Sequence, residues 1–400
     1  MPVPPPDRAL GGGGDQRPWV FLSHSLGRIG PPIYLLHLLR WLAVHDPRPV
    51  EVVSLADGPL RSEFEALGRV TVLAGMDPGR LTAEQATHPS PPDAEALHRA
   101  LAHLDDVGLV HVNTAISVRA LRYLPPVAAP VVAHVHELEI GLSVHIRDED
   151  RADLHAAQPH WVAASQAVAA NLAARHGVPA DAIAVHHEMI DAHPRPAARA
   201  TADLRAGLGI PADAPVVGTA AVVSWRKGPD LFALMARRVL EDPHGAAAHL
   251  VWLGADEADP VTGRFRADLR AAGLADRVHV VPAVADPLDW LRAFDVFVLP
   301  AREDAFPLAC LEAASVARPV VCFNTGGMPE LVEDDAGIVV PYPDLDGLAG
   351  AVTALLADPA RAERLGRTGQ AKVRARHDVS VAAPRLHADL LRWVEGWSGR

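Results

Sequence analysis

Short apolar runs alternate with amphipathic stretches along almost the whole chain. A continuous apolar run is typical of a strand buried on both faces, and apolar residues every three or four positions are typical of a helix lying on a sheet. In the first half, such runs predict strands at residues 19–23, 50–54, 70–74, 107–112, 131–136, 160–164 and 183–186. Helical patterns lie between them, as at 33–44, so we expect a parallel α/β sheet.

Residues 191–215 are rich in Ala, Pro and Arg, which indicates a linker. The alternation then restarts, with strands predicted at 216–220, 249–253, 278–281, 296–299, 320–323 and 337–340, followed by helices at 345–356, 360–376 and 381–397. We therefore expect two doubly wound, Rossmann-like α/β domains with the ligand site in the cleft between them. The expected division is a disordered tail at 1–17, an N-terminal domain at 18–190, a linker at 191–213, a C-terminal domain at 214–380 and a last helix at 381–400.

Composition and charge narrow the classes of partner. The 400 residues carry 37 Lys and Arg against 49 Asp and Glu, a net charge of −12, whereas nucleic acid and anionic lipid attract a basic surface. Cys310 and Cys322 lie in apolar stretches, and neither they nor the 21 histidines show the spacing of a metal site. No apolar run reaches the ~18 residues of a membrane span. We expect a cytoplasmic protein that binds no nucleic acid.

Residues 299–319 combine the end of a strand, a polar loop and the start of a helix. Pro307 is expected in the first helical turn, where its missing N–H would have had no partner. The free amides of Phe306 and Leu308 then face the cleft, where the helix dipole favours an anion. Asp304 precedes the helix and Glu312 follows eight positions later, so both carboxylates can accept hydrogen bonds from sugar hydroxyls. A capping Asp and a solvated Glu are the alternative.

This segment resembles the E-x7-E signature of the GT-B glycosyltransferases of family 4, a large retaining family. The resemblance implies that Asp304 contacts the transferred sugar and that Glu312 holds the ribose of the nucleotide. It implies a metal-independent transferase whose co-substrate is a UDP- or GDP-linked sugar, with no further cofactor. It also implies that the helix at 381–400 packs back on the N-terminal domain.

Two more segments of the second half resemble the same family. In residues 218–230 a strand enters a loop with Arg226, Lys227 and a glycine, and the family grips the donor diphosphate with a Lys-Gly of this kind. Many members carry an arginine where Val222 stands here, and Arg226 would supply the second cation instead. A solvated basic turn is the alternative. Residues 326–330, Gly-Gly-Met-Pro-Glu, also match, although an ordinary turn and a first-turn Glu330 explain them nearly as well.

The first half resembles the family more loosely. Gly30, in the loop after the first strand, falls where family members place glycines near the donor phosphates. His136 ends a strand where the family often has a histidine that contacts the donor sugar, and a core histidine is the alternative for His136 and for the neighbouring His134. Asn113-Thr114 and Ser165 follow strands and are expected to line the acceptor side.

Other functions find less support in the sequence. A metal-dependent transferase needs an Asp-x-Asp at an early strand end, whereas the acidic triplets at 148–150 and 344–346 read as surface or cap residues. The glycine motifs of P-loop hydrolases and dinucleotide-binding dehydrogenases are missing from the sequence. A non-catalytic carbohydrate-binding protein and a nucleotide-sugar epimerase on the same fold stay as alternatives. The acceptor, whether a saccharide, a lipid-linked saccharide or a small molecule, is open, as is a peripheral contact with a membrane.

Overall fold

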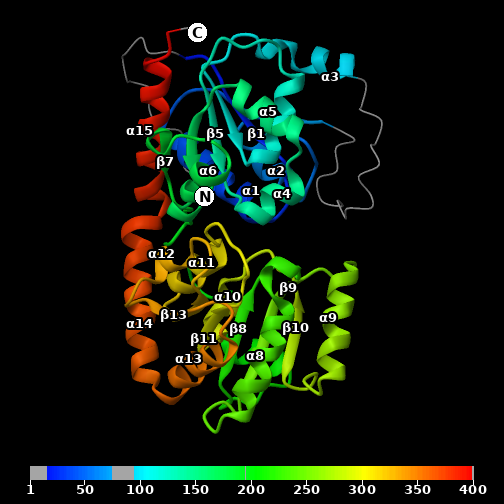
Figure 1. Ribbon diagram of the computed structural model, residues 1–400, viewed down its shortest axis with the longest axis vertical. Coiled ribbons are helices and arrows are strands. Elements are labelled where there is room, and N and C mark those ends of the chain that lie inside the picture. Colours follow the sequence, from blue (N-terminus) through cyan, green and yellow to red (C-terminus); the bar gives the residue numbers. More distant parts are fainter. Residues whose placement is uncertain (1–15, 74–93, 194, 399–400) are drawn as a thin grey trace.

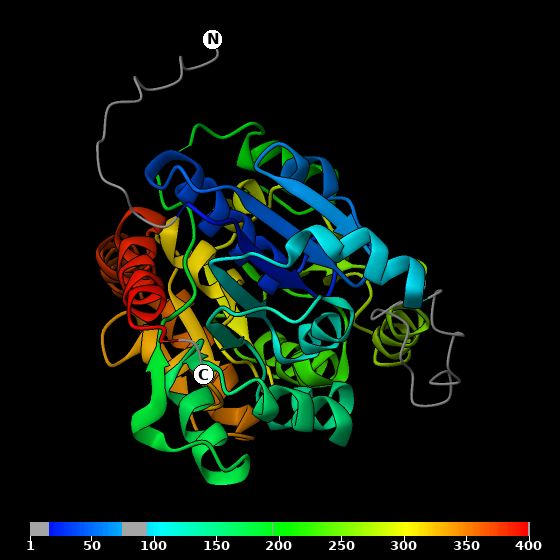
Figure 2. The same cartoon turned by 90° about the horizontal axis from the view of Figure 1, so that it is seen from above.

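The computed structural model describes residues 16–73, 94–193 and 195–398 and consists of two α/β domains, one above the other (Figure 1). Apart from its last two residues, the tail expected at 1–17 lies outside the described residues. Each domain is built on a parallel sheet, so the predicted fold class is confirmed. Viewed along the long axis, the N-terminal domain covers much of the C-terminal one (Figure 2).

The sheet of the N-terminal domain has seven parallel strands in the order β3-β2-β1-β4-β5-β6-β7. The chain reverses its direction of travel across the sheet between β1 and β4, and ligands of open α/β sheets bind beyond the carboxyl ends of strands at such a point. The strands are β1 (Trp19–Ser23), β2 (Val50–Ser54), β3 (Arg69–Val72), β4 (Leu109–Asn113), β5 (Val131–Val135), β6 (His160–Ala163) and β7 (Ile183–Val185).

The sheet of the C-terminal domain has six parallel strands in the order β10-β9-β8-β11-β12-β13. Its reversal point lies between β8 and β11, which pair directly. The strands are β8 (Val216–Ala220), β9 (His249–Ala255), β10 (Val278–Pro282), β11 (Val296–Leu299), β12 (Val320–Phe323) and β13 (Gly337–Val340).

Apolar residues run continuously along the central strands because both faces of each sheet are covered by helices. Successive side chains of a strand point to opposite faces. In β11, Val296 and Val298 join one buried cluster, together with the helices at 229–241, 260–271 and 345–357. Phe297 and Leu299 join the other cluster, together with the helices at 288–293 and 308–315. The absence of polar alternation in the sequence therefore reflects burial on both sides.

The helices lie on the two faces of the sheets and at the domain edges (Figure 1). They are α1 (Gly30–His45), α2 (Arg61–Glu65), α3 (Ala94–Leu101), α4 (Glu139–His145), α5 (Asp148–Ala156), α6 (Gln166–Arg175), α7 (Thr201–Gly207), α8 (Pro229–Glu241), α9 (Pro260–Ala271), α10 (Leu288–Ala293), α11 (Leu308–Ser315), α12 (Met328–Val332), α13 (Leu345–Ala357), α14 (Pro359–Lys372) and α15 (Val379–Glu395). Short helical turns include η2 (Ala115–Tyr123), η4 (Trp225–Lys227) and η5 (Val373–His377).

The segment expected as a linker is partly helical. Helix α7 forms within it, and its Leu204 is buried in a cluster of the C-terminal domain. The chain crosses between the domains near Ile190 and again near Asp378, and these two crossings pair with each other. The amide of Ile190 donates to the carbonyl of His377 at 3.0 Å, and the amide of Val379 donates to the carbonyl of Ile190 at 2.9 Å.

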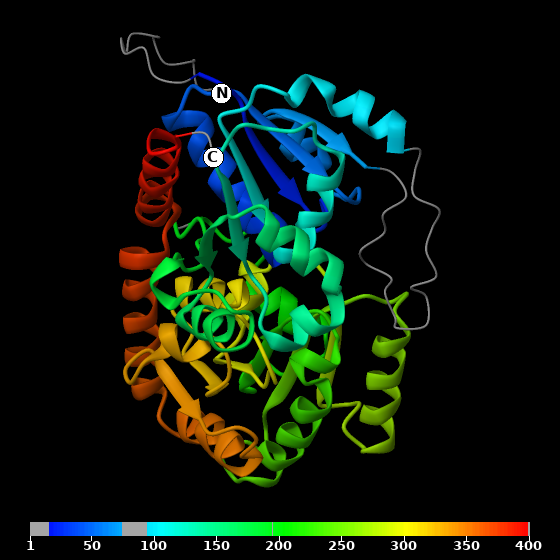
Figure 3. The same ribbon diagram turned by 45° about the horizontal axis from the view of Figure 1, so that its top comes forward.

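After the second crossing, α15 packs on the N-terminal domain. Leu386 and Leu390 are buried in one cluster with Trp19 and Tyr34. His387 also bonds through its Nε2 to a carboxylate oxygen of Asp46 at 2.7 Å. Figure 3 shows the orange-to-red C-terminal helices along one side of the molecule, beside both domains. Among the described residues, no helix has the length and apolar character needed to cross a membrane.

Candidate functional site

The loops after β8 and β11 lie next to each other because these two strands are paired. Arg302 fastens the loops together: its amide donates to the carbonyl of Arg226 at 2.8 Å and its guanidinium to the carbonyl of Trp225 at 2.8 Å. The same guanidinium holds Asp230, with contacts of 2.9 and 2.6 Å. Sequence reasoning did not single out Arg302, whose role is to place the two predicted cations.

Lys227, Arg226 and Asp304 form one charged cluster at these loops. The ammonium group of Lys227 is ion-paired with the Asp304 carboxylate, and Arg226 lies 3.8 Å from the same carboxylate. Arg226 also donates to the carbonyl of Glu303 at 2.9 Å. Burial lowers the pKa of Lys227 below its usual value, with Asp304 acting in the opposite direction and Arg226 adding to the decrease. The structure therefore brings together three residues predicted from separate motifs.

Two glycines allow the backbone to approach closely here. Gly228, directly after Lys227, has a φ of 72°, and a Cβ at this position would lie 2.3 Å from the carbonyl oxygen of Pro300. Gly326 has a φ of 60°, and its Cβ would lie 1.8 Å from the carbonyl oxygen of Asp304. Only glycine fits a left-handed backbone in such contact. The glycines thus hold the charged loops against their neighbours.

Helix α11 follows this cluster and begins at Leu308. Pro307 is its N-cap and not a first-turn residue as expected, because its extended ψ of 122° places it just outside the helix. Phe306, Pro307 and Leu308 are buried. The backbone amides of Phe306 and Leu308 make no hydrogen bond with any described residue. Such amides at the start of a helix can bind an anion.

Glu312 lies in the second turn of α11 and is partly buried. Its carboxylate has no hydrogen-bonding or ion-pair partner among the described residues. Burial raises its pKa to about 7, with Asp286 adding to the rise and Arg195 opposing it. A carboxyl group in this state is ready to accept hydrogen bonds from a ligand, because no protein donor competes for it.

In the N-terminal domain, His136 is buried after β5 with both ring nitrogens facing oxygen atoms. Nδ1 lies 2.5 Å from a carboxylate oxygen of Glu188, and Nε2 lies 3.1 Å from the amide oxygen of Asn113. Asn113 is oriented by its own bond of 3.1 Å from Nδ2 to the carbonyl of Pro31, at the start of α1. His136 therefore links β4, β5 and the segment after β7. Its expected contact with a donor sugar stays a prediction.

Polar groups around His136 are also buried. Glu137 accepts hydrogen bonds from the amides of Ala115 and His136 at 3.2 and 3.0 Å. Burial raises the pKa of Glu137, while these amides and Arg226 oppose the rise. Burial lowers the pKa of His24 to about 4, with the nearby His136 adding to the decrease. Glu137 and His24 were not predicted, since neither belongs to a recognisable motif.

The remaining candidate residues of the N-terminal domain have different surroundings. Thr114 has a φ of 89°, an unusual conformation for a β-branched residue, and its hydroxyl contacts His24 Nδ1 at 3.3 Å. Ser165 caps α6 by accepting from the amide of Val168 at 3.1 Å. A Cβ added to Gly30 would meet no atom within 4 Å, so packing does not require glycine there. His134 is a core residue, with both ring nitrogens buried and unpartnered.

The domains contact each other directly where the cleft was expected. The Glu303 carboxylate accepts from the amides of Ile140 and Gly141, in the first turn of α4, at 2.9 and 3.2 Å. Ala305, from the C-terminal domain, is buried in an apolar cluster of the N-terminal domain. A carboxylate at a helix start is stabilised by the free amides and by the helix dipole. Glu303, which sequence reasoning missed, therefore joins the two domains.

Glu330 makes a second contact of this kind. Its carboxylate accepts from the amides of Gln166 and Ala167 at the start of α6, at 2.9 and 3.0 Å, and bonds to His187 Nε2 at 2.7 Å. Burial alone would raise the pKa of Glu330, but these three hydrogen bonds outweigh it and lower the pKa. Glu330 thus lies in the first turn of α12 and also interacts with α6 of the other domain.

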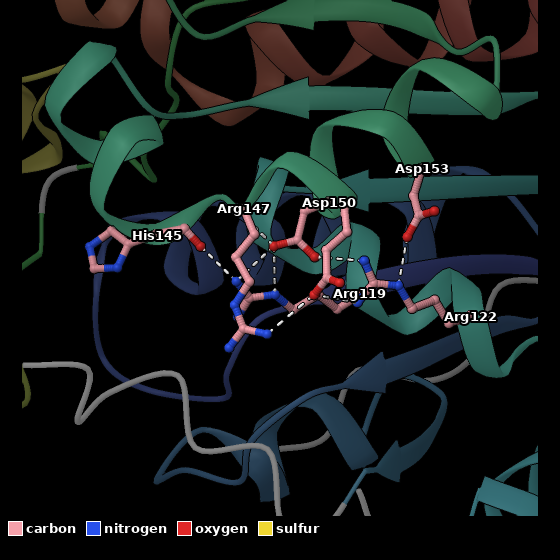
Figure 4. A network of polar contacts seen from close by, with 7 residues as sticks. Arg119, Arg122, His145, Arg147, Asp150 and Asp153 are labelled. Carbon is pink, nitrogen blue, oxygen red and sulfur yellow. Dashed lines mark hydrogen bonds and ion pairs between the residues drawn. The ribbon is translucent and has the colours of Figure 1, made fainter. Parts of the chain in front are cut away.

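The acidic triplet at 148–150 is structural. Asp150 is fully buried and binds the guanidinium groups of Arg119 and Arg122 at 2.8 Å each, as Figure 4 shows. It also accepts from the amide of Arg147 at 3.0 Å, at the start of α5. The expectation of surface or cap residues holds, since Asp148 and Glu149 are exposed and the buried Asp150 caps α5. Asp344 caps α13 by accepting from the amide of Gly347 at 2.8 Å.

Comparison with known proteins identifies the family. A family model described as glycosyl transferases group 1 matches residues 214–358. D-inositol 3-phosphate glycosyltransferase 1 of Catenulispora acidiphila is 31% identical over 292 residues, which cover 68% of this chain and 68% of the relative. The chain belongs to the glycosyl transferases group 1 family. The predicted relationship is thereby confirmed.

Other relatives of this group 1 chain match over shorter stretches. D-inositol 3-phosphate glycosyltransferase of Xylanimonas cellulosilytica is 35% identical over 181 residues, 44% of this chain and 42% of the relative. The lipopolysaccharide core biosynthesis mannosyltransferase LpcC of Rhizobium leguminosarum is 32% identical over 176 residues, 43% of this chain and 49% of the relative. The match therefore spans less than half the length of each of these two relatives.

Solved structures share the fold of this group 1 chain. Anabaena HepE in complex with UDP-glucose superposes with a TM-score of 0.75 at 20% identity, over 94% of this chain and 99% of HepE. Sucrose-phosphate synthase of Thermosynechococcus elongatus superposes with a TM-score of 0.72 at 22% identity, over 96% and 100% of the two chains. The GT-B fold that the sequence predicted is confirmed.

Removing the Glu330 carboxylate should loosen the contact between the domains. In Glu330→Ala the amides of Gln166 and Ala167 lose their acceptor, and loss of a helix cap costs about 1 kcal/mol. We expect hydrogen exchange of these two amides to be about fivefold faster. Glu333→Ala is the matched control, because Glu333 pairs with Lys372 and Arg376, which both lie in the same domain as Glu333. Unchanged exchange in Glu330→Ala would contradict the contact.

Proposed function

We propose that this group 1 family member transfers a sugar from a UDP- or GDP-linked donor to a hydroxyl group of an acceptor, with retention and without a metal ion. The observation that supports it most is the convergence of Lys227, Arg226 and Asp304 at the start of α11, with the unpaired carboxylate of Glu312 further along that helix. Cations, free helix amides and a separate carboxylate suit the diphosphate and the ribose of one ligand.

In this proposal the donor diphosphate binds to Lys227, Arg226 and the amides of Phe306 and Leu308. The diphosphate replaces Asp304 as the partner of the buried Lys227, and the freed Asp304 carboxylate accepts hydrogen bonds from the sugar. Glu312 accepts hydrogen bonds from the ribose hydroxyls. The domain contacts through Glu303 and Glu330 lie beside this position, so domain closure over the bound donor would exclude water from the reacting carbon.

The surroundings of the site support metal independence. As the bond to the sugar breaks, negative charge builds on the departing diphosphate. Arg226 and Lys227 are placed to stabilise that charge, and the start of α11 adds its dipole. The acidic triplet at 148–150 is already engaged, since Asp150 is paired with two arginines. The positive charge that a metal would supply therefore has a source in the protein.

The carboxylates around the site also support retention. Glu137 and Glu303 accept hydrogen bonds from backbone amides, and Glu188 contacts His136. Each of these three carboxylates already contacts a polar group of the protein, so its use as the base of an inverting reaction would break that contact. The leaving phosphate would instead accept the proton of the acceptor hydroxyl, so that the new bond forms on the face from which the diphosphate departs.

The acceptor would bind on the N-terminal side, near His136 and the loop that contains Gly30. The names of the relatives refer to D-inositol 3-phosphate and to the lipopolysaccharide core, and HepE was solved with UDP and glucose. Those names are consistent with an acceptor that offers a polyol or sugar hydroxyl, either free or linked to a lipid. We propose this chemical class for the acceptor of the present chain.

Nucleoside diphosphates should stabilise the protein against heat. A ligand that binds only the folded state at about 100 times its Kd adds about 2.7 kcal/mol to the free energy of unfolding. We expect one of UDP and GDP to raise the Tm, to do so equally with EDTA present, and to lose the effect in Glu312→Ala. Glu241→Ala, an exposed carboxylate of the same domain, is the control that should keep it.

Three outcomes would count against parts of this proposal. If no nucleoside diphosphate stabilises the protein, the non-catalytic alternative is favoured. If stabilisation requires a divalent metal, metal independence is wrong. Conversion of a nucleotide sugar with no acceptor present would favour the epimerase alternative.

Donor binding should tighten as the pH rises through 7. The pKa of Glu312 is raised to about 7, so below this pH the carboxyl group is protonated and accepts hydrogen bonds from the ribose less well. If only the ionised form binds, affinity for a nucleotide sugar at about pH 6 is roughly tenfold lower than at about pH 8. A nucleotide sugar is the right probe, because its diphosphate gains no proton in this range.

Calorimetric titration across this pH range measures the effect. Glu312→Gln should bind more weakly and lose the pH dependence. Asp286→Asn should move the transition to lower pH, since Asp286 contributes to the raised pKa. A wild-type affinity that is independent of pH would contradict the role of Glu312.

A further inference from the structure

A polar pocket lies beside the two places where the chain crosses between the domains. Its volume is about 340 Å³, and it is lined by residues of α10, the end of α11 and the α14–η5 segment, together with residues next to the first crossing. Neither Lys227 nor Glu312 lines it, but Arg195, which does, acts on the pKa of Glu312, so the pocket adjoins the α11 side of the proposed donor site. The volume falls at the lower end of the roughly 300–1,000 Å³ of small-molecule sites.

Four arginines line this pocket: Arg195, Arg292, Arg318 and Arg374. Arg292 is paired with Asp289 at 2.9 Å, and Arg195 lies 3.5 Å from Asp286. In contrast, the guanidinium groups of Arg318 and Arg374 make no ion pair and no hydrogen bond with the residues that the structure describes. Asp191 is the one carboxylate among the residues that line the pocket, so arginines outnumber carboxylates in its lining.

Arg318 is the most unusual of the four. Its Nε is buried without a hydrogen-bond partner. Burial lowers its pKa, and Asp295 opposes this decrease while Arg205 and Arg292 add to it. Arg318 as a whole is half-buried, but a buried N–H group of a cation without a partner is unfavourable, and a bound anion would remove that penalty. Arg374, which also lines the pocket, is exposed, so its side chain can move to meet a ligand.

A cation is a poor alternative occupant of this region. Asp191 and His193, which line the pocket, and the neighbouring Asp378 have ligand atoms within 4.8 Å of one another. However, Asp378 already accepts hydrogen bonds from the amides of Ala192 and Ser380, at 3.0 and 2.9 Å. Burial acts to raise the pKa of Asp191. The hydrogen bonds from His193 and the charge of Arg195 outweigh burial and lower this pKa. The arginines would repel a metal ion.

We propose that this pocket binds the phosphate group of a phosphorylated small molecule. A guanidinium group offers parallel N–H donors that match two phosphate oxygens, which makes arginine the favoured phosphate ligand. Arg318 and Arg374 supply the free donors, Arg292 adds charge, and Gln370 and Ser315 line the remaining wall. A phosphate ion alone would leave much of the volume empty, so the rest of the molecule occupies it.

Binding is tested with hexose 6-phosphate and with inorganic phosphate at constant ionic strength, by calorimetry and by the shift in Tm. We expect the sugar phosphate to bind more tightly than inorganic phosphate, and Arg318→Gln/Arg374→Gln to weaken its Kd at least tenfold. Arg364→Gln is the matched control, since Arg364 is exposed on α14 and forms no ion pair among the described residues. Arg374→Gln alone, at an exposed position, should fold normally and bind with intermediate affinity.

Lys227→Met separates the pocket from the proposed donor site. Sugar-phosphate binding that survives in Lys227→Met and is lost in the double arginine variant supports the pocket, whether or not nucleotides bind elsewhere. The proposal is overturned if the wild type does not respond, or if binding is lost in Lys227→Met and kept in the double variant. A response to inorganic phosphate equal to that to the sugar phosphate would overturn the assignment to a phosphorylated small molecule.

Discussion

The arrangement of the two domains depends on one kind of interaction. Carboxylates of the C-terminal domain accept hydrogen bonds from backbone amides at helix starts in the N-terminal domain. Glu303 binds the start of α4 and Glu330 the start of α6, so the carboxyl ends of both parallel sheets face each other. Parallel strands place their loops at this edge, and helices that follow them begin there with unpaired amides. The same geometry that joins the domains therefore concentrates anion-binding groups between them.

The charged cluster at the start of α11 follows from that constraint. Lys227 and Asp304 come from neighbouring strands and neutralise each other while buried, which keeps the cation in place without a ligand. Glu312 lacks such a partner, and its raised pKa shows the cost of its burial. A ligand that is anionic at one end and rich in hydroxyls at the other would satisfy both groups. This complementarity links the fold to transfer from a nucleotide sugar.

The sequence was informative wherever local pattern decides structure. The strands predicted at 19–23, 50–54, 216–220, 296–299 and 320–323 have the observed bounds, because strands buried on both faces are continuous apolar runs. Arg226, Lys227 and Asp304, selected from two separate motifs, lie together in one cluster, and their binding of a donor stays a prediction. Helix α7 was missed because Ala, Pro and Arg resemble a linker, and its burial depends on partners distant in sequence. Glu303 was missed for a similar reason: its partners, Ile140 and Gly141, lie in another domain.

Nuclear magnetic resonance of sugar turnover tests the central claim most directly. The protein is incubated with the nucleotide sugar that binds it, a hydroxyl acceptor and EDTA, and the anomeric proton of the first product is followed over time. The account predicts turnover without metal and a product with the anomeric configuration of the donor. An inverted product, or turnover that appears only after a divalent metal is added, would contradict it.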